Sequence, residues 1–334
     1  MDLLRSLIYK EDKRVLAHLS QEYPGIYNKY GEKMEMFYFK DQIMDPYSNS
    51  RYFLWDRCNY GLDTHFYSHN NMLYTYGKPL RKYGLLIESR GIVPDHYRLF
   101  ERFKGLEKEF DAVFTYDADI LNKLENAKFF PGTSSVWYGK QENEFAWDDE
   151  CYKRKDKGIS IVSSNKKMCR LHDVRINLSR YCKRNNLADT FGTFDGGPMC
   201  RIDDSLTQYR YSFAIENEIS DYFFTEKITN CFAAQTIPIY LGAGKIDEFF
   251  NIDGIIVIHE RDLEHIENVL KKCTREYYNE HIDAIIDNFH RVFQYRNVFD
   301  WLYEQYFMRN TPAEDGGKDI ESYSECIRIP GTGR

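Results

Sequence analysis

The sequence predicts an α/β protein built from two Rossmann-like domains that face a cleft. Three observations support this fold class: the chain length, the share of apolar residues, and the alternation of strand-like with helix-like segments. The chain has 334 residues, more than one domain of ordinary size, and 43% of them are apolar. Both halves alternate short apolar runs with longer segments of helical periodicity, a pattern typical of parallel sheets covered by helices.

The first half of the chain contains three predicted strands, at residues 35–41, 83–89 and 111–117. Between the last two, about residues 95–110 place most of their aromatic and leucine side chains on one helical face. Strand, helix and strand at this spacing predict a βαβ unit and a partly parallel sheet.

The second half repeats this order more clearly. It contains predicted strands at residues 158–164, 211–215, 236–241 and 254–258, and predicted helices at about 168–184 and 225–234. From about Asp262 to Phe307 the chain is predicted to be helical. Residues 309–334 form a polar tail that we expect to be mobile.

The domain boundary is expected in the polar, charge-rich segment between Trp147 and Lys157. This boundary gives an N-terminal domain of residues 1–150. The C-terminal domain, residues 151–308, then carries the terminal helices.

The net charge of −7 argues against general nucleic-acid binding, which requires a basic surface. No apolar run approaches the ~20 residues that cross a bilayer, and the N-terminal residues are too charged for a signal peptide. The eight cysteines form no CxxC pair and have no metal-like spacing with histidine, as is typical of reduced thiols. We therefore expect a cytoplasmic protein without a transmembrane segment, and leave open a peripheral contact at an inner membrane.

A candidate anion site lies where a predicted strand ends at Glu216-Asn217 and a predicted helix begins at Thr225. Threonine is a favourable N-cap, and the free N–H groups behind it favour an anion. Lys227 lies in the first turn, where the helix dipole disfavours a cation, so a negatively charged ligand such as a diphosphate would explain it. The carboxylate of Glu226 is able to accept two hydrogen bonds from ribose hydroxyls. An exposed lysine without such a role is the alternative.

A basic cluster precedes this site. Between residues 166 and 184 the chain has seven basic side chains and one acid, Asp173. Most of them are expected on a solvated helix face. Arg170, near the predicted strand end at Ser163, is placed to reach a phosphate.

The segment 209–227 resembles the signature of family 10 fucosyltransferases. That signature reads approximately Y-K-F-x-L-A-F-E-N, then seven residues, then T-E-K. Here the run from Tyr209 to Asn217 is followed, after seven residues, by Thr225-Glu-Lys227. Weaker agreement extends to residues 85–94, 110–120, 161–170 and 188–197. The resemblance implies the GT-B architecture, with an acceptor-binding first domain and a donor-binding second domain.

The resemblance implies an inverting glycosyltransferase that moves L-fucose from GDP-fucose to a hydroxyl of a glycan acceptor, in α-1,3 or α-1,4 linkage. Glu88 is the implied catalytic base, and Lys227 and Arg170 are implied to hold the diphosphate. The other implied donor-binding residues are Ser163, Tyr209, Glu216, Asn217, Tyr222, Phe223, Thr225 and Glu226. A lipopolysaccharide or another surface glycan is the acceptor we expect.

No cofactor and no metal ion are expected to be required. Asp117-Ala-Asp119 resembles a metal-binding DxD motif, but it falls in the acceptor domain, within an element that matches the family for other reasons. Lysine and arginine supply the positive charge that a metal would otherwise bring.

Two departures from the family pattern keep the donor sugar open. Phe223 stands where the family usually has tyrosine, with Tyr222 beside it, and Glu218 stands where serine is frequent. The alternatives are a transferase that uses another GDP-sugar, such as a deoxyheptose or colitose, and a non-catalytic protein that binds nucleotides or glycans. A dehydrogenase is disfavoured because no GxGxxG follows an early strand.

Overall fold

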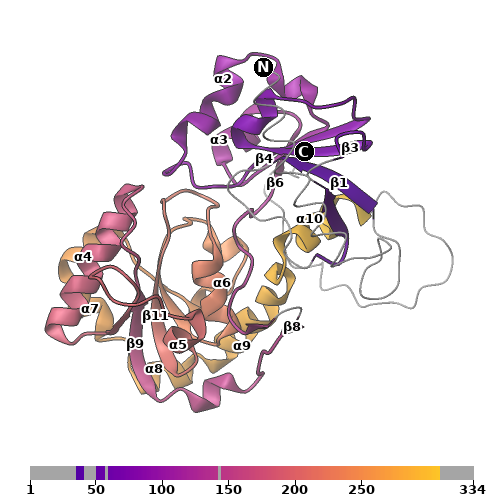
Figure 1. Cartoon of the computed structure of the whole chain (residues 1–334). Helices are drawn as coiled ribbons and strands as arrows, with labels where there is room; N and C mark the ends of the chain where they lie inside the picture. The colour runs from indigo at the N-terminus through magenta and orange to yellow at the C-terminus, as the bar shows by residue number, and fades with distance from the viewer. Residues whose placement is uncertain (1–34, 41–49, 57–58, 142–143, 309–334) are drawn as a thin grey trace, which may run out of the picture.

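The computed structural model describes residues 35–40, 50–56, 59–141 and 144–308. They form two parallel β-sheets in separate parts of the molecule (Figure 1). The predicted α/β class with two Rossmann-like units is therefore confirmed. The polar tail at residues 309–334, expected to be mobile, lies outside the described residues.

The first sheet has six parallel strands in the order β2-β1-β3-β4-β5-β6. Its strands are β1 (Glu35–Lys40), β2 (Phe53–Asp56), β3 (Thr64–Ser68), β4 (Arg81–Leu86), β5 (Ala112–Thr115) and β6 (Ala127–Phe129). In β4 and β5 the last four residues of each strand are buried, as expected for strands covered on both faces. The three strands predicted in this half are confirmed, with ends shifted by a few residues.

The helix predicted over about residues 95–110 is broken into short pieces. The pieces are η2 (Pro94–Arg98), α2 (Leu99–Arg102) and η3 (Leu106–Glu109), and a helix α3 (Ala118–Lys123) follows β5. Gly105 separates α2 from η3 with a φ of 88°, a left-handed conformation that a helix interior does not contain. The apolar face predicted from the sequence is therefore real, but one glycine prevents a continuous helix.

The second sheet has five parallel strands in the order β10-β9-β11-β12-β13. Its strands are β9 (Lys157–Val162), β10 (Asp189–Phe191), β11 (Tyr209–Ile215), β12 (Ile237–Leu241) and β13 (Ile256–Val257). The helices between them are α4 (Arg170–Asn185), α5 (Ile202–Leu206) and α6 (Glu226–Ala233). The strand order reverses between β9 and β11, and in such sheets ligands bind beyond the carboxyl ends of the strands at that point.

The C-terminal helices form a broken series instead of one long helix. They are η7 (Glu260–His265), α7 (Ile266–Leu270), α8 (Arg275–Glu280), α9 (Ile282–Arg291), η8 (Val292–Tyr295) and α10 (Val298–Tyr306). The remaining elements are η1 (His69–Leu73), β7 (Lys140–Gln141), β8 (Glu144–Phe145), η4 (Cys151–Arg154), η5 (Ile246–Glu248) and η6 (Ile252–Gly254). Thr274 and Asn297 cap α8 and α10 with side-chain oxygens, so each of these helices starts at its own capping signal.

The last helix, α10, crosses back to the first sheet (Figure 1). Its Asp300 accepts hydrogen bonds from the Ser50 hydroxyl and the Arg51 backbone N–H, at 2.7 and 2.8 Å. The ring of Tyr303 stacks on Tyr52 with centroids 4.4 Å apart. The expected C-terminal domain, residues 151–308, therefore includes a helix that packs on the N-terminal sheet.

One apolar core joins the two sheets. Phe129, at the end of β6, stacks on Phe249 of the second half with centroids 5.3 Å apart. Tyr116, just beyond β5, packs on Phe223 at 4.6 Å. These contacts hold the carboxyl ends of β5 and β6 against the segments that follow β11 and β12.

No helix within the described ranges is long and apolar enough to cross a bilayer. The cysteines in the same part of the chain form no disulfide.

Candidate active site

Two loops from different sheets meet at the candidate active site. One follows β4 and carries Glu88, and the other follows β11 and leads to Lys227 at the start of α6. The Ser89 hydroxyl of the first loop donates to the Glu218 carboxylate of the second at 2.8 Å. The site therefore combines a carboxylate from one domain with a cation from the other.

Glu88 is held by two backbone hydrogen bonds and one side-chain hydrogen bond. Its N–H donates to Nε2 of His69 at 3.1 Å, and its carbonyl accepts the Tyr97 hydroxyl at 2.5 Å. Its own carboxylate accepts from the N–H of Ser89 at 2.7 Å. Glu88 is thus fixed in position while its side chain remains partly accessible.

Burial raises the pKa of Glu88 above its ordinary value. The positive charge of Lys227 acts in the opposite direction, and the negative charge of Glu226 raises the pKa further. The two domains are therefore close enough for charges at the start of α6 to act on Glu88. A carboxylate with a raised pKa is a better base near neutral pH.

His69 supports Glu88, and no pattern in the sequence indicated this role. Its side chain is buried, and burial, aided by the nearby His96, lowers its pKa to about 3. The imidazole is therefore neutral, and Nε2 is the acceptor that holds the Glu88 N–H. The φ of His69 is 52°, a left-handed conformation that is uncommon for histidine and is concentrated at functional sites.

The start of α6 is organised by a fully buried carboxylate. Glu216 accepts from the Thr225 N–H at 2.9 Å and from the Thr225 hydroxyl at 2.7 Å. Thr225 is the N-cap expected from the sequence, and its hydroxyl oxygen accepts from the N–H of Lys227. Glu216 therefore shapes the loop and is itself shielded from a ligand.

The ammonium group of Lys227 lies at the N-terminus of α6, with the side chain 19% exposed. It is 3.0 Å from the Thr225 hydroxyl, 3.2 Å from Glu226 and 3.5 Å from Glu216. The carboxylates fix the ammonium where the free N–H groups of the helix also point. This arrangement favours a diphosphate at the same place.

Asn217 is positioned by two side chains of α4. Its Oδ1 accepts from Nη2 of the buried Arg175 at 3.0 Å and lies 3.1 Å from Nε2 of His172. Nδ1 of His172 accepts from the Met168 N–H at 3.0 Å, so Nε2 carries the proton and donates to Asn217. In the sequence Arg175 was one of seven basic residues, and His172 carried no signal.

Replacing Arg175 by methionine is expected to lower the free energy of unfolding by about 2–4 kcal/mol, because Asn217 and the buried Glu216 lose a charged partner. Urea unfolding followed by circular dichroism measures the change. Arg180→Met, on the exposed face of the same helix, should change the value by at most about 0.5 kcal/mol. Equal losses of unfolding free energy in the two variants would contradict the role of Arg175 as the partner of Asn217 and Glu216.

Asp117 and Asp119, the DxD pair, are engaged by an arginine of their own domain. Arg90 lies 3.0 Å from Asp117 and 2.8 Å from Asp119. Asp117 also caps α3 by accepting from the Ile120 N–H at 3.0 Å. In the part of the chain that the structure describes, no three His, Cys, Asp or Glu side chains are grouped to hold a metal ion. Metal independence stays a prediction.

Residues 152–308 match the family model described as Glycosyltransferase family 10 (fucosyltransferase) C-term. This part of the chain is similar to glycosyltransferase family 10. An 85-residue segment is 27% identical to the α-(1,3)-fucosyltransferase FucT of Helicobacter pylori, and covers 25% of this chain and 17% of that relative.

Two solved structures share the fold. An α1,3-fucosyltransferase with GDP has a TM-score of 0.50 at 15% identity and covers 75% of this chain and 81% of its own. Anabaena Alr3699/HepE, in complex with UDP and glucose, has a TM-score of 0.50 at 9% identity. The match covers 74% of this chain and 78% of the HepE chain. At such low identity the likeness concerns the fold, and it confirms the expected GT-B architecture.

Two residues expected to bind the donor, Tyr209 and Ser163, lie at opposite ends of neighbouring strands of the second sheet. Tyr209 is buried at the amino end of β11, opposite the end that carries Glu216, and its hydroxyl donates to Asp189 at 2.6 Å. In this position Tyr209 supports the sheet, and its expected contact with the donor stays a prediction. Ser163 is buried just beyond β9, where its N–H donates to the Phe191 carbonyl at 3.0 Å.

Arg170 begins α4 on the surface of the domain that carries the second sheet, and it forms an ion pair with Glu260. Its side chain is 66% exposed, in contrast with the buried Arg175 one and a half turns later. Arg175 positions Asn217, and the phosphate contact expected of Arg170 stays a prediction.

Packing against a bound donor would require the ring of Phe223 to be exposed on the loop between β11 and α6. The ring is not exposed there. Its ring is 1% exposed and packs on Tyr116 of the first domain. The neighbouring Tyr222 has its hydroxyl 2.9 Å from the ammonium of Lys245. Phe223 therefore packs in the apolar core between the two sheets, and its expected donor contact stays a prediction.

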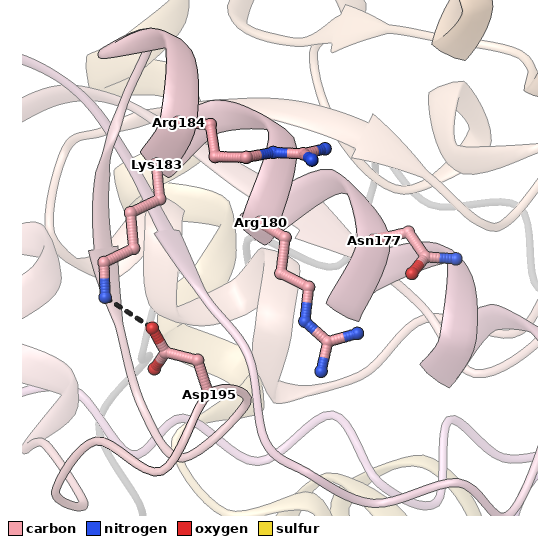
Figure 2. Close-up of a pocket in the computed structure, with 5 residues that line it drawn as sticks. All are labelled: Asn177, Arg180, Lys183, Arg184 and Asp195. Carbon is pink, nitrogen blue, oxygen red and sulfur yellow. Dashed lines mark hydrogen bonds and ion pairs between the residues drawn. The ribbon is translucent and has the colours of Figure 1, made fainter.

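A separate hollow of about 500 Å³ lies on the exposed face of α4 (Figure 2). It is lined by Asn177, Arg180, Lys183, Arg184 and Asp195. Lys183 forms an ion pair with Asp195, and the arginines extend from the helix toward solvent (Figure 2). This face is opposite the one that carries Arg175, so the basic cluster is mainly the solvated helix face expected from the sequence.

Proposed function

We propose that this protein is an inverting glycosyltransferase that moves L-fucose from GDP-fucose to a hydroxyl group of a glycan, in α-1,3 or α-1,4 linkage. The observation that carries the proposal is that the charge of Lys227, at the start of α6, acts on Glu88 of the first domain, in a chain whose residues 152–308 match the family 10 model. One group has the properties of a base, and the other supplies positive charge at a helix N-terminus.

Inverting transfer is a single displacement at the anomeric carbon. Glu88 takes the proton of the acceptor hydroxyl as its oxygen forms the new bond, while the bond to the diphosphate breaks on the opposite side. Lys227 and the free N–H groups of α6 stabilise the negative charge that develops on the leaving GDP. A general base contributes about 10²–10⁴-fold in rate, and charge stabilisation of this kind about 10²–10³-fold.

The fold alone does not select the nucleotide, because the relative with GDP and the relative with UDP and glucose have equal TM-scores. The family match and the segment similar to FucT favour GDP-fucose. Glu218, which kept the donor sugar open in the sequence, has its carboxylate turned to the loop of Glu88. This contact removes one reason to prefer another GDP-sugar.

A donor panel tests the proposal. Purified protein is incubated with GDP-fucose, GDP-mannose, UDP-galactose or UDP-N-acetylglucosamine, with and without N-acetyllactosamine. Nucleotide release is followed in the presence and in the absence of EDTA. We expect release from GDP-fucose alone, stimulated by the acceptor and unaffected by EDTA. Release from a UDP-sugar alone would contradict the proposed donor, and loss of release with EDTA would contradict metal independence.

The raised pKa of Glu88 gives a prediction for the pH dependence. The base acts in its ionised form, so kcat/KM falls as the pH is lowered through the pKa of Glu88. Because burial raises this pKa above the ordinary 4.5, the acid limb should lie above that pH. Initial rates from about pH 4 to 8, with circular dichroism to confirm folding, locate the limb. A limb at or below pH 4.5 would exclude Glu88 as the titrating base.

A further inference from the structure

Glu218 lies in the loop between β11 and α6, residues 216–225, which we call the donor loop. It links this loop to the loop that carries the proposed base, Glu88. Its Oε2 accepts from the Ser89 hydroxyl at 2.8 Å and from the Gly91 N–H at 2.7 Å. Both donors are neutral groups of the first domain and lie within three residues of Glu88. Hydrogen bonds to an ionised acceptor are roughly twice as strong as those between neutral groups.

Ser89 connects Glu218 to Glu88 by hydrogen bonds to both carboxylates. Its side chain is fully buried, and its N–H donates to Oε1 of Glu88 at 2.7 Å. Its Oγ donates to Glu218 and accepts from the Gly91 N–H at 3.0 Å. The orientation of the Glu88 carboxylate therefore depends on a residue whose own side chain is held from the other domain.

The two loops also touch through their backbones. A Cβ atom at Gly91 would lie 3.1 Å from the carbonyl oxygen of Asn217, tighter than most carbon–oxygen contacts, and 3.5 Å from Cβ of Glu218. Glycine at this position allows the donor loop to approach closely. Arg90 is occupied by Asp117 and Asp119, so it does not compete for the Glu218 carboxylate.

We propose that Glu218 is a positioning residue, which holds the 89–91 loop so that the carboxylate of Glu88 keeps its place opposite Lys227. This inference rests on the proposed function. The Lys227 ammonium contacts Thr225, Glu226 and Glu216, and the Asn217 amide contacts Arg175 and His172, so loss of the Glu218 side chain should leave the diphosphate site intact. The effect should fall on turnover, because a displaced base can cost up to about 100-fold.

The test compares Glu218→Ala and Glu218→Gln with Glu264→Ala, a control at an exposed glutamate of the same domain. For Glu218→Ala we expect kcat to fall about 10–100-fold, with KM for GDP-fucose and the Kd of GDP within about twofold of wild type. Glu218→Gln keeps a carbonyl acceptor for Ser89 and Gly91, so it should restore most of kcat. Wild-type turnover in Glu218→Ala would overturn the proposal, as would Ala and Gln variants that lose kcat, GDP binding and thermal stability together.

Amide hydrogen exchange separates this inference from the proposed function. The Gly91 N–H should exchange faster in Glu218→Ala than in wild type, because it loses the charged one of its two acceptors and keeps only the Ser89 hydroxyl. If wild-type protein transfers no fucose, the proposed function is wrong, and the exchange rates still decide whether Glu218 orders the loop of Glu88. Unchanged exchange at Gly91 would overturn the positioning role whatever the donor.

Discussion

Replacing Glu88 by glutamine lowers kcat for fucose transfer by about 10²–10⁴-fold, the range of a general base. Glutamine keeps the shape of the side chain and is able to accept from the Ser89 N–H, but it takes no proton. Burial already disfavours the charge of Glu88, so the substitution should not destabilise the fold. GDP binding should stay near the wild-type value, because we propose that the other domain holds the diphosphate.

The measurement is GDP release from GDP-fucose at saturating acceptor, with GDP binding and thermal unfolding of the same preparations. Glu125→Gln, at an exposed glutamate of the same domain, is the matched control and should keep full turnover. Turnover of Glu88→Gln within about threefold of wild type would remove Glu88 from the mechanism and leave the base unassigned.

Replacing Lys227 by methionine should lower kcat by about 10²–10³-fold and also weaken GDP binding. The ammonium faces the same charge in bound GDP and, more strongly, in the leaving GDP of the transition state, so both quantities should change. Loss of the cation also leaves the buried Glu216 without its nearest charge, so some stability should be lost. This combination differs from that of Glu88→Gln, where binding and stability are retained.

Two comparisons make the Lys227 experiment specific. Lys227→Arg keeps the charge and should restore GDP binding more than turnover, because the guanidinium does not reproduce the compact ammonium among Thr225, Glu226 and Glu216. Lys272→Met, at an exposed lysine of the same domain, should behave as wild type. Unchanged GDP affinity in Lys227→Met would show that the diphosphate lies elsewhere.

Seven of the eleven strands described in the two parallel sheets could be predicted, because most of them are short, buried apolar runs. The strands β2, β3, β6 and β10 were not predicted, and β10 is not buried. The start of α6 could also be predicted, since Thr225 is a capping residue at a fixed distance from a strand end. These features depend on local sequence. The break at Gly105 was also local, but the apolar periodicity around it outweighed one glycine in the prediction.

Features set by tertiary contacts could not be predicted. The return of α10 to the first sheet depends on Asp300 meeting Ser50 and Arg51, some 250 positions earlier in the chain. The roles of His69 and His172 depend on which backbone or amide group each ring reaches after folding. Neither histidine stands in a spacing that distinguishes it from a core residue.

The family signature itself combines two kinds of residue. Lys227 and Asn217 lie at the open edge of the site, whereas Glu216 is fully buried and Tyr209 lies at the opposite end of β11. Glu216 and Tyr209 keep the strand and loop in shape, and a sequence pattern does not separate that role from contact with a ligand. Burial and hydrogen-bond partners make the distinction.

Calorimetric titration of the wild-type protein with GDP, UDP and GMP, in buffer containing EDTA, tests the central claim most directly. The fold is shared equally with a relative that holds GDP and one that holds UDP and glucose, so the choice of nucleotide is what the proposed function adds. We predict that GDP binds and that GMP binds much more weakly, because it lacks the second phosphate facing Lys227. We also predict that UDP does not compete with GDP for the site. Tighter binding of UDP than GDP, or equal binding of GMP and GDP, would contradict the account.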